Sequence, residues 1–270
     1  MTADDSFDEV PLAQQNVGGV LLLTLNNPIR RNALSEIMLL ALDDAFERAT
    51  NDPGVRVVIL AAIGPVFCAG HDLTEMNAAR DSIDRGRAYF SKILSQCSSV
   101  MQKIISCPKP VIAEIDGVAT AAGCQLVATC DLALASEQAQ FCTPGVNIGL
   151  FCSTPMVALT RNLLNKHAME MLLTGDMLPA KRAAEIGLVN QVLPSSDLRS
   201  ASMTLATKIA SKSSLTLAVG KRAFYLQKEM ELADAYDYTK EIMVENMLAH
   251  DAKEGINAFL EKRTPNWFDK

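Results

Sequence analysis

Two short segments of small residues contain the residue types best suited to chemistry in this chain. Residues 67–73 read FCAGHDL, and residues 117–126 read GVATAAGCQL. Each segment follows a run that is typical of a strand. Small side chains let a ligand approach the main chain closely, and two backbone N–H groups directed at one point can stabilise a developing oxyanion. The two segments therefore predict chemistry on a carbonyl group, carried out by backbone atoms.

Ala122 is the residue of the second segment that we expect to donate, because a helix is predicted to begin there. A backbone N–H in the first turn of a helix has no partner within the helix, and the helix dipole favours negative charge at that end. The alternative is that the small residues 121–123 only allow a helix and a strand to pack closely. The similar turn earlier in the chain favours a pair of donors.

His71 and Gln125 are the polar side chains nearest to these donors in sequence. His71 could act as a general base, but only Asp72 lies near enough in sequence to orient it, so we favour a role for its backbone alone. Asp72 is expected to cap the following turn. Gln125 can hydrogen-bond a carbonyl or a water molecule but cannot abstract a proton. For Cys124 and Cys152 we favour buried, inert thiols over activated nucleophiles.

Further polar residues have both a functional and a structural interpretation. A polar pair before a proline is best interpreted as a helix N-cap, and two carboxylates that flank the second segment could face the surface. Basic pairs could bind phosphate groups, although solvated surface charge is the commoner outcome. These residues are Ser153 and Thr154, Glu114 and Asp116, Arg30 and Arg31, and Lys262 and Arg263.

Alternating strand and helix patterns surround the two segments. Strands are predicted at residues 19–25, 55–61, 110–115 and 131–135, and helices after Ser35, at about 87–106 and at about 122–130. This spacing indicates parallel strands with right-handed crossovers. The polar stretch 75–86 is predicted to be a mobile surface segment.

The second half of the chain is predicted to be mainly helical. A short strand is expected near residues 189–192, followed by helices at 198–211, 215–230 and about 233–263. The predicted organisation is an α/β core over residues 1–200 and a helical region over residues 201–270.

Composition argues against several classes of partner and cofactor. The net charge of −6 and the lack of a dense Lys/Arg run argue against nucleic acid or a membrane as partner. The seven cysteines and three histidines lack metal-ligand spacing, so no metal site is expected. Unpaired cysteines, together with residues 1–9, which resemble neither a secretory signal nor a transit peptide, predict a cytoplasmic protein.

In their order and spacing, motifs along nearly the whole chain resemble the crotonase superfamily, the enoyl-CoA hydratase/isomerase family. The resemblance implies an α/β fold, a crotonase (ClpP-like) spiral of ββα units with a C-terminal helical trimerisation region. It also implies a homotrimer or a dimer of trimers, and it points to a branch that includes mitochondrial enoyl-CoA-hydratase-domain proteins of animals. The motifs lie at residues 25–34, 67–73, 110–117, 123–131, 139–141, 174–176, 183–189 and 258–263.

The ligand that the resemblance implies is an acyl-CoA thioester, with coenzyme A bound as part of the substrate. The thioester carbonyl would lie in an oxyanion hole formed by the N–H groups of His71 and Ala122. The residues that match family contacts to the thioester and its phosphates are Arg30, Arg31, Ala69, His71, Asp72, Leu73, Ala122 and Lys262.

Two family positions depart from the pattern of enoyl-CoA hydratases, which use two glutamates to hold and activate water. By motif match these positions hold Gln125 and Gly145, and a third, acidic in some isomerases, holds Ser153. Loss of acid–base help typically costs about 10²–10⁴ in rate. The positions expected to act in the reaction are His71, Ala122, Gln125, Gly145 and Ser153.

The resemblance implies an enoyl-CoA hydratase-like lyase of fatty-acid metabolism. Two alternatives stay open: another reaction of the superfamily, such as isomerisation, decarboxylation or thioester hydrolysis, or acyl-CoA binding without catalysis. If the missing carboxylates limit hydration, then Gln125→Glu combined with Gly145→Glu should raise it.

Overall fold

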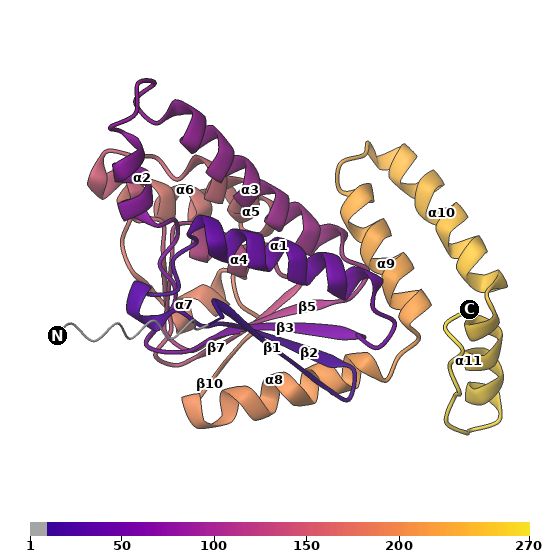
Figure 1. The fold of residues 1–270 in the computed structure, drawn as a ribbon. Coiled ribbons are helices and arrows are strands. Elements are labelled where there is room, and N and C mark those ends of the chain that lie inside the picture. Colours follow the sequence, from indigo (N-terminus) through magenta and orange to yellow (C-terminus); the bar gives the residue numbers. More distant parts are fainter. Residues whose placement is uncertain (1–9) are drawn as a thin grey trace.

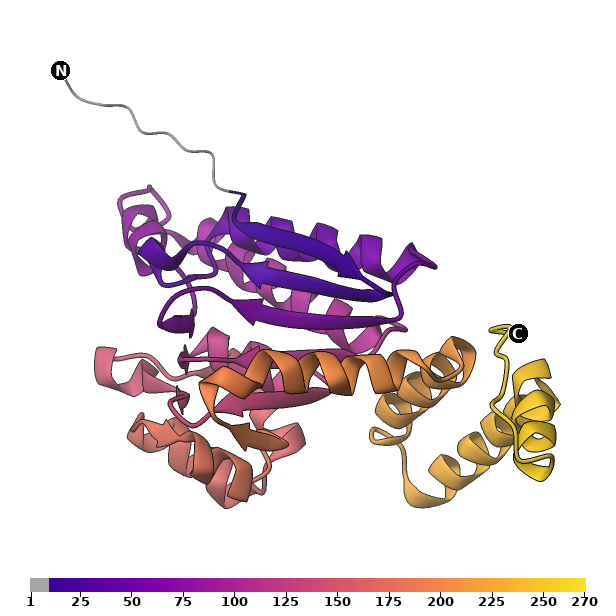
Figure 2. The ribbon, with the colours of Figure 1, turned by 90° about the horizontal axis from the view of Figure 1, so that it is seen from below.

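The computed structural model describes residues 10–270, whose strands form one sheet of six strands and one of four (Figures 1 and 2). The expectation drawn from residues 1–9 lies outside the described residues. Between residues 10 and 270, no helix combines the length and the apolar character needed to cross a membrane.

In the larger sheet, β1 pairs antiparallel with β2 and the other neighbours pair parallel. Four predicted strands are confirmed as β2, β3, β5 and β7, and the short late strand as β10. The edge strand β1 was not predicted, because five of its six residues are exposed and it lacks an apolar pattern. The order is β1 (Leu12–Val17), β2 (Val20–Leu25), β3 (Val57–Ala62), β5 (Val111–Ile115), β7 (Leu132–Ser136) and β10 (Gln191–Leu193).

Helices cover both faces of this sheet (Figure 1). Because side chains alternate along a strand, Val58 and Leu60 of β3 belong to the core shared with α1 (Glu36–Asn51) and α3 (Arg87–Ser106). Val57 and Ile59 face the other way, into the core shared with α8 (Ser195–Ala210). Burial on both faces explains the continuous apolar run of the strand.

The smaller sheet consists of very short strands, of which β4, β6 and β8 are parallel. None was predicted, because two or three residues are too few to show a periodic pattern. The order is β4 (Val66–Cys68), β6 (Val118–Thr120), β8 (Gln140–Cys142) and β9 (Leu178–Pro179).

Residues 75–86, predicted to be a mobile surface segment, are helical in their first part, which belongs to α2 (Leu73–Ala79). Asp72 begins this helix by accepting the N–H groups of Thr74 at 2.8 Å and Glu75 at 3.2 Å. The remaining connections contain η1 (Pro28–Arg30), α4 (Ala122–Thr129), η2 (Pro144–Ile148), α5 (Ser153–Asn162), α6 (Asn165–Thr174) and α7 (Ala180–Glu185).

The C-terminal helices α9 (Ser214–Gln227), α10 (Leu232–Leu248) and α11 (His250–Leu260) extend from one side of the molecule (Figures 1 and 2). The single helix predicted over residues 233–263 was wrong, because the extended backbone of Ala249 divides it into α10 and α11. Residue 200, the predicted end of the core, falls inside α8, which packs on the larger sheet.

Candidate functional site

The candidate site lies where the three parallel strands of the smaller sheet end. β4 leads to His71, β6 leads to Ala122, and β8 leads to Gly145 of η2. The carboxyl ends of parallel strands meet at one edge of a sheet. This topology therefore brings together residues that are far apart in the chain.

Backbone hydrogen bonds hold the first turn from two sides. The Leu34 N–H donates to the Gly70 oxygen at 2.7 Å. The Thr120 hydroxyl donates to the Ala69 oxygen at 2.9 Å, which joins the first turn to the second. Gly70 has φ +85°, a left-handed conformation that glycine adopts without strain.

The second turn is held in an unusual backbone conformation at Ala121. This residue has φ 50° and ψ −117°, and its N–H donates to the Cys142 oxygen at 2.9 Å. Such conformations cost on the order of 1–3 kcal/mol for residues other than glycine and are concentrated at functional sites. The conformation makes Ala122 the first residue of α4.

The two turns touch one another through glycines. A Cβ atom placed on Gly70 would lie 3.2 Å from the Ala122 nitrogen, and one placed on Gly123 would lie 2.1 Å from the Cys68 oxygen. A Cβ on Gly123 therefore cannot be accommodated without a shift of the backbone.

The N–H groups of His71 and Ala122 donate to no acceptor among residues 10–270. An unpaired backbone donor on a turn is available to a ligand, and the dipole of α4 adds positive potential at Ala122. Two such donors on adjacent turns can serve one ligand oxygen, as in a hole for a carbonyl or an enolate.

The His71 side chain, unlike its backbone N–H, is not placed to act on a ligand. Both imidazole nitrogens are covered by protein atoms; the Leu34 backbone lies beside the ring, but neither nitrogen makes a hydrogen bond of good geometry. Burial lowers the pKa of His71 below its ordinary value of 6.5, so the ring is neutral at pH 7. With both nitrogens covered, the ring is not placed to take a proton from a ligand in this conformation, and the unpaired donor that His71 retains is its backbone N–H.

Gln125 lies one turn into α4 from Ala122 and is only 5% exposed. Its side-chain oxygen is buried and accepts no hydrogen bond, whereas its backbone oxygen accepts one from the Thr129 hydroxyl at 2.7 Å. An unsatisfied buried acceptor costs about 1–3 kcal/mol. Gln125 thus places a polar but non-acidic group beside the turn.

Gly145 has no room for a side chain. A Cβ atom there would lie 2.9 Å from the Cys152 sulfur and 2.9 Å from the Leu150 oxygen. The substitution Gly145→Glu therefore needs a local shift, which makes it a poor partner for Gln125→Glu.

The N-cap interpretation of Ser153 was wrong. Cys152 occupies the N-cap position of α5 without a side-chain cap, and Ser153 is the first helical residue. The Ser153 side chain is exposed, and its hydroxyl donates to the Phe151 oxygen at 3.3 Å.

All seven cysteines are unpaired and buried. Burial raises the pKa of Cys68 to about 12 and that of Cys142 to about 11, and it also raises the pKa values of Cys124 and Cys152. These thiols stay protonated at neutral pH, which leaves them poor nucleophiles.

The basic candidates fall into two places. Arg30 pairs with Asp72 at 3.3 Å, and the oxygen of the neighbouring Arg31 accepts the Ala69 N–H at 3.1 Å, so both lie beside the first turn. Leu73, which begins α2, is exposed there. Lys262 follows the end of α11, a helix that lies at the opposite side of the molecule from α2 (Figure 1).

Asn32 was missed by the sequence interpretation, although it supports the site. It is fully buried; its side-chain oxygen accepts the Asn27 N–H at 2.8 Å, and its amide nitrogen donates to the Val66 oxygen at 2.7 Å. It thereby fastens the segment before Leu34 to β4. The signal available was a polar residue inside the otherwise apolar and basic run 28–34.

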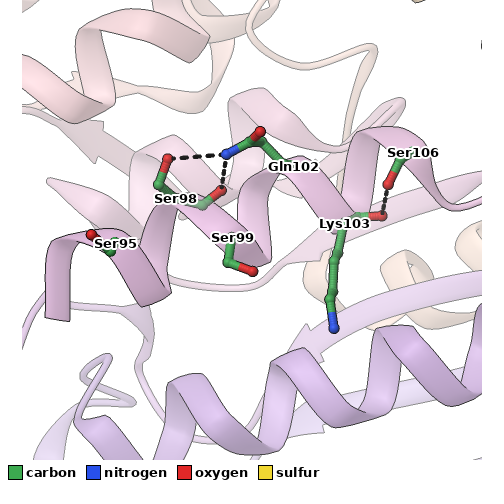
Figure 3. A pocket seen from close by; sticks show the side chains of 6 residues that line it. All are labelled: Ser95, Ser98, Ser99, Gln102, Lys103 and Ser106. Carbon is green, nitrogen blue, oxygen red and sulfur yellow. Dashed lines mark hydrogen bonds between the residues drawn. The ribbon is translucent and has the colours of Figure 1, made fainter. Parts of the chain in front are cut away.

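A separate groove lies on the outer face of α3 (Figure 3). Lys103 extends from it toward α1, where it pairs with Asp43 at 2.9 Å and Glu47 at 3.0 Å. The remaining lining side chains are neutral, so the groove offers no reactive group. They are Ser95, Ser98, Ser99, Gln102 and Ser106.

Over most of its length the chain is similar to known proteins. Residues 15–270 match the family model described as Enoyl-CoA hydratase/isomerase. The chain is 44% identical over 257 residues to the human mitochondrial enoyl-CoA hydratase domain-containing protein 3, covering 95% of this chain and 83% of that protein. It is 34% identical to the 2,3-dehydroadipyl-CoA hydratase of Escherichia coli, covering 92% of this chain and 94% of that protein.

Solved structures agree with the expected crotonase fold. The crystal structure of the human domain-containing protein 3 superimposes with a TM-score of 0.91 at 44% identity, covering 95% of this chain and 100% of that one. An enoyl-CoA hydratase of Mycobacterium smegmatis also gives a TM-score of 0.91, at 48% identity, covering 96% of this chain and 99% of that one.

The prediction of a cytoplasmic protein is contradicted by these relatives. The similar proteins of human, Xenopus laevis and rat are all named mitochondrial. The prediction relied partly on unpaired cysteines, and thiols stay reduced in any reducing compartment, so they do not distinguish the cytosol from another one.

Proposed function

The chain belongs to the enoyl-CoA hydratase/isomerase family, and from this premise we propose that it binds an acyl-CoA thioester with the carbonyl oxygen between the N–H groups of His71 and Ala122. One observation carries the proposal: these two donors, on turns in direct contact, have no acceptor among residues 10–270. One donor of this kind is typically worth about 10²–10³ in rate, because the negative charge of an enolate strengthens its hydrogen bonds.

Coenzyme A carries anionic phosphates, and Arg30 and Arg31 offer positive charge beside the first turn. Lys262 follows α11, which lies on the opposite side of the molecule from α2, so we propose that it reaches the phosphates of a second copy. This requires assembly through the C-terminal helices, as a homotrimer or a dimer of trimers. Several apolar side chains of α10 and α11 are exposed, which supports such assembly.

The reaction that we propose is hydration of an enoyl-CoA. Water adds to the β-carbon and gives up a proton to solvent water, the electron pair of the double bond moves onto the thioester oxygen, and the enolate then takes a proton from solvent water at the α-carbon. The side-chain NH₂ of Gln125 can orient water by donating a hydrogen bond, but the amide cannot accept the proton. We therefore expect slow turnover, about 10²–10⁴ below that of an enzyme with full acid–base help.

The test follows the loss of the conjugated-thioester absorbance of crotonyl-CoA at high enzyme concentration. Gln125→Glu should raise the rate by at least about tenfold, since it supplies a carboxylate. The matched control is Gln102→Glu on the exposed face of α3, which should leave the rate unchanged. No turnover by the wild type and by Gln125→Glu would exclude hydration.

Decarboxylation is a second candidate, favoured by the amide at Gln125. Breaking the bond between the α-carbon and a carboxylate releases CO₂ and leaves the electron pair as an enolate, so no base has to abstract a proton. Water then supplies the proton to the α-carbon. The measurement is CO₂ release from malonyl-CoA and methylmalonyl-CoA. Tight binding of butyryl-CoA with neither activity would indicate an acyl-CoA-binding protein.

A further inference from the structure

We propose that Glu75 is a positioning residue that holds the His71 donor in place by joining α2 to both α1 and α3. The inference rests on the proposed function, because it gives the His71 N–H its role. It assigns no contact with the substrate to Glu75 itself.

The Glu75 carboxylate accepts two hydrogen bonds from neighbouring helices. One comes from the backbone N–H of Glu36 at 3.1 Å, and the other from the Tyr89 hydroxyl at 2.9 Å. Glu36 is the first residue of α1, so its N–H lacks an intrahelical acceptor. The dipole of α1 also favours a carboxylate at this end.

The same short segment of the chain holds the other end of the turn. Leu34 lies two residues before Glu36, and its N–H donates to the Gly70 oxygen at 2.7 Å. The stretch from Gly70 to Glu75 is thus fastened at both ends to residues 34–36. His71 lies inside this closed loop, and Asp72 caps α2 within it. Release of Glu75 would free the start of α2 from α1 and α3, and would leave the loop held by the Gly70 contact and by the ion pair between Arg30 and Asp72.

Tyr89 keeps its contact over a wide pH range. Burial, with the Glu75 carboxylate beside it, raises the pKa of Tyr89 to about 12. The phenol therefore remains a hydrogen-bond donor at neutral and mildly alkaline pH. Because Tyr89 belongs to α3, the contact links α2 to the layer of helices that covers the larger sheet.

The variants for the test separate positioning from stability. Glu75→Ala removes both contacts, Tyr89→Phe removes one with a smaller risk of unfolding, and Glu75→Gln retains an acceptor oxygen for rescue. The control is Lys103→Met, which breaks the ion pairs that join α3 to α1 further along the same helices. All variants are compared by thermal unfolding.

The first readout is the infrared carbonyl frequency of ¹³C-labelled butyryl-CoA bound to the protein. A hydrogen-bonded carbonyl absorbs at lower frequency than a free one, so the wild type should show a downshift. We expect Glu75→Ala to lose at least half of this downshift. Its kcat for crotonyl-CoA should fall about 10–100-fold, because even a small misplacement of an active-site group lowers the rate. Its KM should change little. Glu75→Gln and Lys103→Met should behave like the wild type.

An unchanged downshift and kcat in Glu75→Ala would overturn the inference, and so would an equal loss in Lys103→Met. The absence of binding or of a downshift in the wild type would instead overturn the proposed function. In that case, hydrogen exchange of the amides of residues 69–76 still tests the clamp. Faster exchange in Glu75→Ala than in Lys103→Met supports it, and equal exchange overturns it.

Discussion

At the residue scale, the contact between the two turns depends on the absence of a side chain at Gly123. A Cβ atom there would lie 2.1 Å from the Cys68 oxygen, and the backbone at that point cannot rotate away as a side chain could. The close approach of α4 to β4 thus makes glycine a steric requirement of the site.

Gly123→Ala should therefore destabilise the protein by about 3 kcal/mol, near the upper end of typical overpacking costs. Gly220→Ala is the matched control: it lies within α9, a Cβ there meets nothing within 4 Å, and it should gain about 0.5–1 kcal/mol. Urea unfolding of both variants measures the two effects. Equal stability of the two variants would contradict the close approach.

The neutral His71 ring leads to a pH dependence. Burial lowers its pKa, so below about pH 6.5 the unfolded chain binds a proton that the folded protein does not. The wild type should lose stability as pH falls through this range, with a slope of up to about 1.4 kcal/mol per pH unit from this group. His71→Gln should lack this part of the slope. Parallel curves for both proteins between pH 7.5 and 5.5 would show that the ring titrates normally.

At the scale of elements, a buried ion pair joins α9 to the core. The Lys221 ammonium donates to the Asp131 carboxylate at 2.7 Å and to the Ile104 oxygen at 2.9 Å. Asp131 also accepts the Tyr225 hydroxyl at 2.9 Å and the Val111 N–H at 2.7 Å. The end of α3, the starts of β5 and β7, and α9 thus share one polar network.

Lys221→Met should cost about 3–5 kcal/mol, because it leaves the Asp131 carboxylate without its cation in a site where the two side chains are only 7% and 17% exposed. Arg161→Met is the control: it breaks the exposed pair with Glu229 and should cost less than about 1 kcal/mol. Denaturant titration distinguishes them. A small loss in Lys221→Met would mean that this ion pair contributes little to holding α9 on the core.

At the scale of the whole molecule, the C-terminal helices present apolar side chains that the single chain leaves uncovered. Leu232, Tyr236, Met243 and Met247 recur at helical spacing along α10 and are all exposed, and Phe259 of α11 is 82% exposed. Monomeric proteins rarely expose so continuous an apolar face. The proposed assembly would bury it.

We expect sedimentation to give a mass three or six times that of the 29.2 kDa chain. Phe259→Asp should shift the protein toward the monomer, because it places a charge in the buried interface. Ile83→Asp is the control, since that side chain is fully exposed but lies outside the C-terminal helices. A monomeric wild type, or equal dissociation in both variants, would contradict assembly through these helices.

The amino-acid sequence by itself was sufficient for four long strands of the larger sheet, for α3 and for the two turns. Strands β2, β3, β5 and β7 and helix α3 have apolar patterns that do not depend on distant residues. The helix caps at Ser35 and Asp72 were predictable for the same reason, since each cap bonds N–H groups only two or three residues ahead.

Only the tertiary structure decided what surrounds the turns. The unpaired donors of His71 and Ala122 become neighbours because β4 and β6 pair in parallel, although they are far apart in sequence. The covered His71 ring, the lack of space at Gly145 and the hold of Glu75 on α1 and α3 likewise arise from packing between distant segments. A local pattern specifies which residues form a turn, but contacts through space determine which of its groups remain free for a ligand.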